Sequence, residues 1–362
     1  MTAVCRSRHA ALRARPRGVT HDQIIPVATT AREPGEQAEG RCRRVALNSD
    51  TIHMTIHTPI DTLINSVRIG APVVSGSLFM VPLFGDASPV AVAPLSLDEA
   101  LTADLLEIEE VSEAGSVPEL MALNKGTGLI FLLDGEQVTG VKQNRTFNLS
   151  MLLAPGMRTT VPVSCLELGR WAKRGGSVQS AEHVHFAKGR AAKMRSVSES
   201  LSQSRSFRSD QSKVWADIEE HSAASACFSA TSAEADIYEA RRETLAPLVS
   251  QFVFQPRQLG AVFGIGDRIV GLDLFGSDDL YAKVADKLIR SYALDALHAE
   301  TPASPPVTDA IASMIDRALS ARRAPFPAPG VGETWRFDGD DVAGAALVHA
   351  GQCVHFEAFV QA

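Results

Sequence analysis

Short apolar runs bounded by turn residues follow one another between about residues 64 and 163, a pattern typical of β-strands. GSLFMVPLFG and GTGLIFLLDGEQVTGV are two such runs, and TFNLSMLL and MRTTVPVS are two more. Asp134 followed by Gly135 predicts a hairpin turn, because Gly accepts the positive φ that a two-residue turn requires. Ser96 with Glu99 three residues later predicts the capped start of one short helix.

The spacing of apolar residues becomes helical from about residue 187 to residue 252. One helix is predicted to open at Ser209 and to carry Phe228 on its apolar side. A second is predicted to open at Ser232 and to bend or end at Pro247, which lacks a backbone N–H. The Ser- and Arg-rich tract RSVSESLSQSRSFRSDQS, which overlaps the first helix, is either a flexible loop or the start of a polar helix.

A hairpin and two further helices are predicted in the following segment. Two apolar runs joined by Gly-Asp in AVFGIGDRIVG indicate a hairpin within 259–276. Apolar residues at every fourth position predict a helix over 278–298. A similar stripe predicts a helix over 304–323, with Ser304 as its cap.

The C-terminal segment ETWRFDGDDVAGAALVHAGQCVHFEAFVQA has the pattern of a three-stranded meander with Asp-Gly and Ala-Gly turns. If Val348 pairs with Cys353 across the last turn, His355 lies opposite Ala346. Along the whole chain, hairpins alternate with groups of helices and do not follow a strict βαβ order. The sequence therefore predicts an α+β fold with antiparallel, hairpin-built sheets and segregated helices.

Composition divides the chain unevenly. Residues 1–53 lack periodicity and carry nine arginines, no lysine and five acidic residues, whereas the whole chain has a net charge of −7. We expect a disordered or non-native leader at 1–53, a main α+β domain at 64–300, and a C-terminal helix at 301–362 with the meander packed on it. The acidic body disfavours a nucleic-acid partner.

Five scattered cysteines, an odd number with no CxxC pair, argue against a disulfide framework or a structural zinc site. Reduced thiols fit a cytoplasmic protein. His183 and His185 offer two ligands, which are too few for zinc. His349 and His355 flank the last turn on opposite faces, so no metal is predicted. No apolar run reaches the roughly 18 residues that a membrane span needs, and we expect no membrane association.

The densest polar segment is GVKQNRTFN, directly after a predicted strand. Its cationic side chains suit a phosphate or a carboxylate, and its amides can recognise a base or a sugar. The alternative is a solvated loop that joins two strands. The candidate ligand-binding residues in this string are Lys142, Gln143, Asn144 and Arg145.

A second polar string, PVSCLELGRW, also follows a predicted strand. Cys165 at the strand end would be a nucleophile if a helical turn opened there, and Glu167 is a candidate acid–base group. The alternatives are a small buried Cys, a helical ion pair between Glu167 and Arg170, and a Trp171 that belongs to the core. We expect the two strings to meet in space and form one cationic pocket, because short strands and turns join them.

GEQVTGVKQNRTFN, PVSCLELGRW, GDRIVGLDLFG and KLIRSYALDAL together resemble the ARG and Rhodanese-Phosphatase-superfamily-associated Protein domain family, which is mainly bacterial. The resemblance runs from about Leu78 to Leu297. It implies partners among ADP-ribosyl-glycohydrolase-like and rhodanese-phosphatase proteins, and a link to NAD, ADP-ribose or phosphoester metabolism. It implies no particular activity and leaves any cofactor unknown, but it favours a site at the two polar strings.

Three functions follow as hypotheses. In the first, the chain is an auxiliary domain for an anionic nucleotide- or ADP-ribose-type ligand. Its anion would be held by Lys142, Arg145 and Arg170, its polar groups would meet Gln143 and Asn144, and Trp171 would stack on it. In the second, the chain is an enzyme that uses Cys165 or Glu167. In the third, it is a structural partner protein.

Overall fold

The computed structural model describes residues 58–86, 93–111, 118–169 and 177–361, so the leader predicted at 1–53 lies outside the described residues. The helices of the described part are α1 (Pro59–Asn65), α2 (Leu97–Thr102), α3 (Ala187–Ser204), α4 (Gln211–Ala224), α5 (Glu234–Ala240), α6 (Arg242–Val249), α7 (Asp278–Ala296) and α8 (Thr308–Ser320). The strands of its largest sheet are β1 (Arg68–Ile69), β2 (Val73–Ser75), β3 (Leu78–Phe84), β12 (Gln258–Ile265), β13 (Arg268–Phe275), β14 (Arg322–Pro327), β15 (Glu333–Asp338), β16 (Val342–His349) and β17 (Gln352–Val360). The remaining strands are β4 (Leu106–Glu110), β5 (Glu119–Asn124), β6 (Ile130–Leu132), β7 (Glu136–Thr139), β8 (Arg145–Phe147), β9 (Met151–Leu153), β10 (Arg158–Cys165) and β11 (Gln179–Val184).

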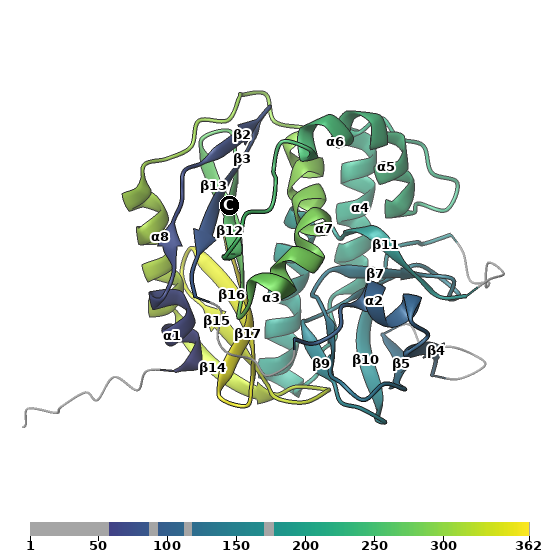
Figure 1. Cartoon of the computed structure of the whole chain (residues 1–362). Coiled ribbons are helices and arrows are strands. Elements are labelled where there is room, and N and C mark those ends of the chain that lie inside the picture. Colours follow the sequence, from purple (N-terminus) through teal and green to yellow (C-terminus); the bar gives the residue numbers. More distant parts are fainter. Residues whose placement is uncertain (1–57, 87–92, 112–117, 170–176, 362) are drawn as a thin grey trace, which may run out of the picture. The chain divides into compact units, whose positions relative to one another are not determined.

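The largest sheet is antiparallel and has nine strands in the described part (Figure 1). Its order is β1-β3-β12-β13-β17-β16-β15-β14, and β2 also pairs with β3. The hairpin expected within 259–276 is confirmed as β12 and β13, and the C-terminal meander as β15, β16 and β17. The sequence did not indicate β14, which extends the meander. Because β17 pairs with β13, the meander and the central hairpin belong to one sheet.

Helices cover both faces of this sheet. Val262 and Phe263 are neighbours in β12 and point to opposite faces, as the two-residue period of a strand requires. Val262 and Leu272 are buried in the cluster that contains the apolar residues of α1 and α8. Phe263 and Phe359 are buried in the cluster formed with α3, α4 and α7. Figure 1 shows α1 and α8 on one side of the sheet and α7 on the other.

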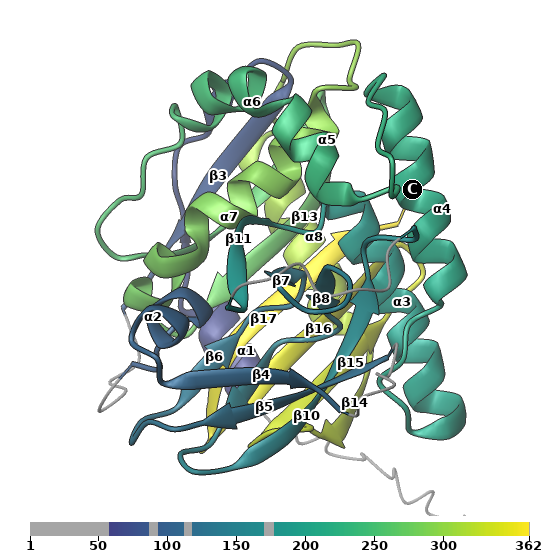
Figure 2. The same ribbon diagram turned by 90° about the vertical axis from the view of Figure 1, so that its right-hand side faces the viewer.

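A second antiparallel sheet, of six strands in the order β11-β7-β8-β10-β5-β4, lies in front of the first in the view of Figure 2. Strands β6 and β9 form a separate pair. The hairpin predicted at Asp134-Gly135 is wrong, because the turn is present but β6 and β7 enter different sheets. Gly135 has a φ of +86°, and its backbone oxygen accepts a hydrogen bond from the backbone N–H of His185 instead of closing a ladder.

Several helix boundaries differ from those predicted. The Ser96 capping box and the helix at 278–298, now α7, are confirmed. Phe228 lies beyond the end of α4 and is 93% exposed, so it is not on an apolar face. The second helix of that region breaks at Arg241 between α5 and α6, and Pro247 lies inside α6. The last helix begins at Thr308 and does not use Ser304 as its cap.

The predicted pairing at the last turn is correct at Val348 and Cys353, but His355 lies opposite Leu347 and not Ala346. The register shifts by one between Leu347 and Val348, which is the signature of a β-bulge. The described part thus consists of antiparallel sheets with helices on their faces, and the α+β prediction is confirmed. None of its helices is both long enough and apolar enough to cross a membrane.

Gly135 should tolerate substitution less well than Gly156, although both have a positive φ. A Cβ at Gly156 meets nothing within 4 Å, so Gly156→Ala should cost about 1 kcal/mol of unfolding free energy from its φ alone. A Cβ at Gly135 would lie 2.8 Å from Cδ of the buried Arg190, and Gly135→Ala should cost clearly more. Urea denaturation measures both losses, and equal losses would contradict this account.

Candidate functional site

The two polar strings lie side by side, because β8 pairs with β10 and sets Arg145 opposite Cys165. The Gln143 side-chain amide donates to the backbone oxygen of Glu167 at 2.7 Å. The Arg145 guanidinium donates to Oε1 of Gln143 at 3.1 Å and contacts Sγ of Cys165. The backbone N–H of Asn144 lies 3.4 Å from the Glu167 carboxylate. The strings therefore contact each other through hydrogen bonds within the fold.

These residues are enclosed. Gln143 and Asn144 are at most 5% exposed, and Arg145, Cys165 and Glu167 are fully buried. Lys142 is half-buried, with its backbone N–H on the Glu110 carboxylate. Cys165 ends β10, and the described residues after it, up to Gly169, form no helix. The other two candidates, Arg170 and Trp171, lie outside the described residues.

A buried network of charges joins α3 to the nine-stranded sheet. Nη2 of Arg190 lies 2.7 Å from Oδ1 of Asp273 and 2.7 Å from Oε2 of Glu357. Asp273 also accepts a hydrogen bond from the Tyr292 hydroxyl at 2.9 Å. All four residues are at most 1% exposed. Charge-assisted bonds of this length, made away from water, fix the position of α3 on the sheet.

The register of the sheet explains why the charges meet. Asp273 on β13 lies opposite Glu357 on β17, which lies opposite Ala345 on β16, and Ala345 lies opposite Arg336 on β15. Directly opposite residues in antiparallel strands share a face, so one row across the sheet carries two acids and one Arg. Two carboxylates placed side by side repel, and Arg190 lies between them and offsets the repulsion.

One turn further along α3, a second buried cation binds the other β-layer. Lys193 forms an ion pair with Asp134, and its ammonium also donates to the backbone oxygen of Phe147 at 2.5 Å. Asp134 belongs to the turn between β6 and β7, and Phe147 ends β8. Helix α3 therefore contacts the nine-stranded sheet through Arg190 and the second β-layer through Lys193.

Burial and neighbouring charges shift the acids of this network in opposite directions. Burial, together with the negative charge of Asp134, raises the pKa of Glu357 to about 8 even though Arg190 is adjacent. Burial alone would also raise the pKa of Asp273, but Arg190 and His355 outweigh it and hold that pKa below its usual value. Burial lowers the pKa of Lys193 against the opposing effect of Asp134.

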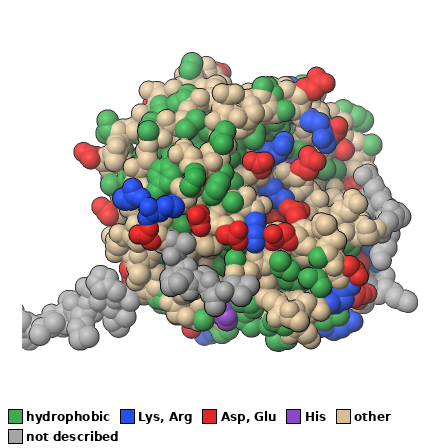
Figure 3. Space-filling view, viewed as in Figure 1, with side chains coloured by type: hydrophobic (Ala, Val, Ile, Leu, Met, Phe, Trp, Pro, Cys, Tyr) green, Lys and Arg blue, Asp and Glu red, His purple; other side chains and the backbone are tan. Residues whose placement is uncertain are grey.

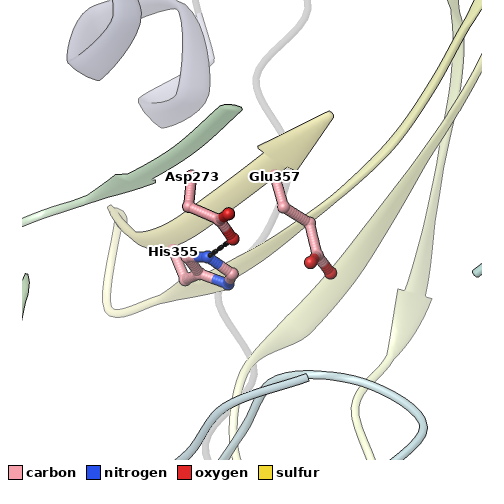
Figure 4. Close-up of side chains that lie close together, drawn as sticks. All are labelled: Asp273, His355 and Glu357. Carbon is pink, nitrogen blue, oxygen red and sulfur yellow. Dashed lines mark hydrogen bonds and ion pairs between the residues drawn. The ribbon is translucent and has the colours of Figure 1, made fainter. Parts of the chain in front are cut away.

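Asp273, His355 and Glu357 bring three potential metal ligands within 4.8 Å of one another. In Figure 4 the His355 ring faces the Asp273 carboxylate, and its Nε2 lies 3.3 Å from Oδ1. The Arg190 guanidinium already contacts both carboxylates, so a metal ion would lie next to a fixed positive charge. The donor set therefore does not fit a metal cation. That the protein binds no metal stays a prediction.

Arg336 differs from Arg190. Arg336 belongs to the row of the sheet described above, whereas Arg190 on α3 faces that row. Arg336 is 5% exposed, and none of its three guanidinium nitrogens has a hydrogen-bond partner among the described residues. Burial lowers its pKa, against the favourable charges of Glu357 and Asp134. A buried cation without hydrogen bonds is costly, so Arg336 contributes little or negatively to stability.

The members of each histidine pair have different surroundings. His183 stacks on Tyr238 with 3.6 Å between ring centroids, and burial lowers its pKa to about 3. His185 lies 2.7 Å from the Glu234 carboxylate, and both side chains are fully buried. His355 is buried in the charge network, whereas His349 is half-buried at the end of β16.

A groove of about 790 Å³ lies between helices α3, α4 and α8, the β12–β13 hairpin and the end of β17. Its floor is apolar, and its charged lining residues are evenly divided in sign. The cations are Lys188, Arg195, Arg268 and Arg317, and the acids are Asp217, Glu220, Asp267 and Asp295. His221, His298, Ser313 and Gln361 are the uncharged or titratable polar residues of the lining.

Two of these four cations lack an acidic partner. Lys188 pairs with Glu220 at 2.8 Å, and Arg317 lies 3.2 Å from Asp341. Arg195 on α3 and Arg268 at the start of β13 form no ion pair with any described residue. Of the four acids, Asp217 and Asp267 likewise form no ion pair with any described residue, so the groove keeps two cations and two acids that the described part of the fold does not pair. In Figure 3, Lys and Arg alternate with Asp and Glu on the face in view.

Neither the charge network nor the groove was predicted from the sequence. One signal was present: Asp273 in GLDLFG and Glu357 in VHFEAFV are single acids inside apolar strand segments. An acid on the buried face of a strand requires a partner, so each of these two acids could have indicated a buried ion pair. The groove had no such signal, because its residues come from segments far apart in the chain.

The fold and the buried polar core define an antiparallel α+β domain. By sequence, this chain belongs to the ARG and Rhodanese-Phosphatase-superfamily-associated Protein domain family, whose match covers residues 66–359. The match extends past Leu297 and includes the C-terminal meander that the resemblance had left out. The searches of curated proteins and of solved structures give no match.

Replacing Arg190 should destabilise the protein far more than replacing Arg336. Arg190→Met leaves the ionised Asp273 buried without its counter-ion and the Glu357 carboxyl without its hydrogen bond, and should lower the unfolding free energy by roughly 3–5 kcal/mol. Arg336→Met removes a cation that has no hydrogen bond in the described part, and should leave the unfolding free energy unchanged or raise it by about 1 kcal/mol. Urea denaturation compares the two, and similar losses would refute the distinction.

Glu357 should make stability fall as pH rises. Its folded pKa of about 8 exceeds the ordinary value of 4.5, so the folded state binds the extra proton between these pH values. This contribution is complete below about pH 4.5 and is lost as pH rises through about 8. Unfolding free energies of the wild type and of Glu357→Gln, measured across that window, should differ by an amount that falls with pH. A constant difference would show that the carboxyl is ionised throughout.

Proposed function

We propose that the chain is a ligand-binding domain whose ligand is an anionic small molecule of the nucleotide or ADP-ribose type, held in the groove between α3, α4 and α8. The observation that carries the proposal is the pair of arginines, Arg195 and Arg268, which line the groove from two elements and have no acidic partner in the described part. Guanidinium groups suit phosphates, which they bind in a bidentate manner.

The remaining lining fits the rest of such a ligand. Carboxylates such as Asp217 and Glu220 accept hydrogen bonds from ribose hydroxyls and from an exocyclic amine. Apolar residues, among them Ile265 and Val270, offer a surface for a base. A volume of about 790 Å³ lies within the range of about 300–1,000 Å³ that is usual for small-molecule sites.

The groove is a better position for the ligand than the two polar strings. Lys142 to Arg145 and Cys165 to Glu167 are not among the residues that line the groove. Hydrogen bonds tie them to one another and to further groups of the fold, such as the side chains of Glu110 and Gln211. Burial also separates Cys165 from solvent, which weakens the alternative of a cysteine-dependent enzyme.

The family name supports the class of partner, because it associates these domains with ARG and rhodanese-phosphatase proteins. The sequence resemblance implies that the first of these are ADP-ribosyl-glycohydrolase-like, and such a partner would act on ADP-ribose. An auxiliary domain that binds the same kind of molecule would hold the substrate or the product of such a partner. The interaction with a partner protein belongs to the proposal as well.

The binding test uses ADP-ribose, AMP and inorganic phosphate in separate titration calorimetry experiments on the full chain. Arg268→Ala and Arg195→Ala should each weaken binding of ADP-ribose roughly tenfold, the effect of losing about 1.5 kcal/mol of charge-assisted hydrogen bonding. The matched control is Arg322→Ala, which removes an exposed Arg on β14 that pairs with Asp338 and lies outside the groove. Absence of binding by all three compounds, or equal weakening in the control, would overturn the proposal.

A further inference from the structure

Four polar side chains form a continuous chain of contacts along one side of the groove. Nε2 of His221 lies 3.0 Å from Oδ1 of Asp295, and Nδ1 of the same ring lies 3.4 Å from Oγ of Ser225. The same Oγ lies 3.1 Å from Nε2 of His298. His221 belongs to α4, Ser225 caps its end, Asp295 belongs to the last turn of α7 and His298 follows that helix.

The chemistry of the groups fixes the direction of every hydrogen bond, provided that the imidazoles are neutral. An ionised Asp295 only accepts, so His221 donates from Nε2 and its Nδ1 must accept. The Ser225 hydroxyl therefore donates to His221, and the lone pairs of its oxygen remain for Nε2–H of His298. Nδ1 of His298 is then the acceptor at the far end of the chain.

The far end is the part that a ligand can reach. Ser225 is 2% exposed and His221 is 6% exposed, whereas His298 is exposed and lines the groove. Nδ1 of His298 has no hydrogen-bond partner among the described residues. Burial lowers the pKa of His298, which favours the neutral ring near pH 7. The opposing charge of Asp295 is the smaller effect.

We propose that His298 is the proton-accepting group of the groove, held as its Nε2–H tautomer by the hydrogen-bonded chain through Ser225 and His221 to Asp295. The proposal deepens the proposed function and rests on it, since the groove must hold the ligand for His298 to act. A hydroxyl group of the ligand, or a water bound beside it, gives its proton to Nδ1 of His298. The electron pair stays on that oxygen, which becomes a nucleophile.

Asp295 and Ser225 act through His298, so each is a positioning residue. Asp295 is itself fixed, because Oδ2 accepts the backbone N–H of Lys188 in the first turn of α3 at 2.8 Å. The ring of His221 packs against Phe186 and against His298, with ring centroids 4.6 Å apart in both cases. These contacts leave the imidazole of His221 one orientation in which both of its nitrogens are bonded.

Long-range ¹H–¹⁵N correlation NMR reads the tautomer of each histidine directly. We expect the wild type to show His298 with Nε2 protonated, Nδ1 unprotonated and widely separated ¹⁵N shifts. Ser225→Ala should bring the two shifts together, because the neutral ring then exchanges between tautomers. Ser222→Ala is the matched control, since Ser222 lies on the same helix and its hydroxyl bonds the backbone oxygen of Cys227, away from the groove. A wild-type His298 protonated at Nδ1 would overturn the proposal.

Chemical modification of the histidines distinguishes failure of the His298 proposal from failure of the proposed ligand-binding function. Diethyl pyrocarbonate should modify His298 faster than the half-buried His183 and the buried His185 and His355, as mapped by peptide mass spectrometry, and His298→Gln should remove that signal. ADP-ribose should slow the modification of His298 several-fold.

A fixed tautomer without protection by ADP-ribose would overturn the proposed function alone. Protection in a protein whose His298 tautomer is unaffected by Ser225→Ala would overturn the relay alone. A melting temperature for each variant identifies any that fails to fold.

Discussion

The rest of the described structure depends on one buried ion pair, in which the Arg190 guanidinium lies between the carboxylates of Asp273 and Glu357. Those two acids are directly opposite each other on β13 and β17, so the centre of the nine-stranded sheet carries two adjacent acids in an apolar setting, of which Asp273 is ionised and Glu357, whose pKa is about 8, keeps its proton below that pH. Without a cation between them the arrangement would be strongly unfavourable. Helix α3 supplies that cation, and its position on the sheet follows from the requirement.

The same helix transmits this constraint to the groove. Arg190 and Lys193 lie on one face of α3 and hold it against both β-layers, as spacing by three residues allows. Lys188, Ala191 and Arg195, at spacings of three and four residues, lie on the neighbouring face and line the groove. The buried ion pairs therefore determine where the ligand-facing cation of α3 stands, although they do not contact the groove themselves.

Local signals in the sequence predicted elements whose pairing is local. The β12–β13 hairpin, the meander and α7 depend on turns and on a periodicity contained within about twenty residues, and all three were predicted. Asp134-Gly135 has the same local signal, yet β6 pairs with β9 and β7 with β8 and β11. These pairings form because the apolar side chains of β6 are buried among residues distant in sequence. A turn motif does not contain information about such contacts.

The same contrast between local and long-range contacts applies to the candidate sites. It explains why the two polar strings were predicted from the sequence and the groove was not. Gln143, Arg145 and Glu167 lie close together in space because β8 pairs with β10, and hydrogen bonds join Gln143 to Arg145 and to the backbone of Glu167. A polar group whose bonds are used within the fold specifies structure and has little capacity left for a ligand. In the described part, Arg195 and Arg268 form no ion pair and Nδ1 of His298 has no hydrogen-bond partner. The three residues come from segments that only the folded chain brings to one groove. Unused hydrogen-bonding and charge capacity at a solvent-accessible hollow is therefore the better guide to function in this protein than the density of polar residues along its sequence.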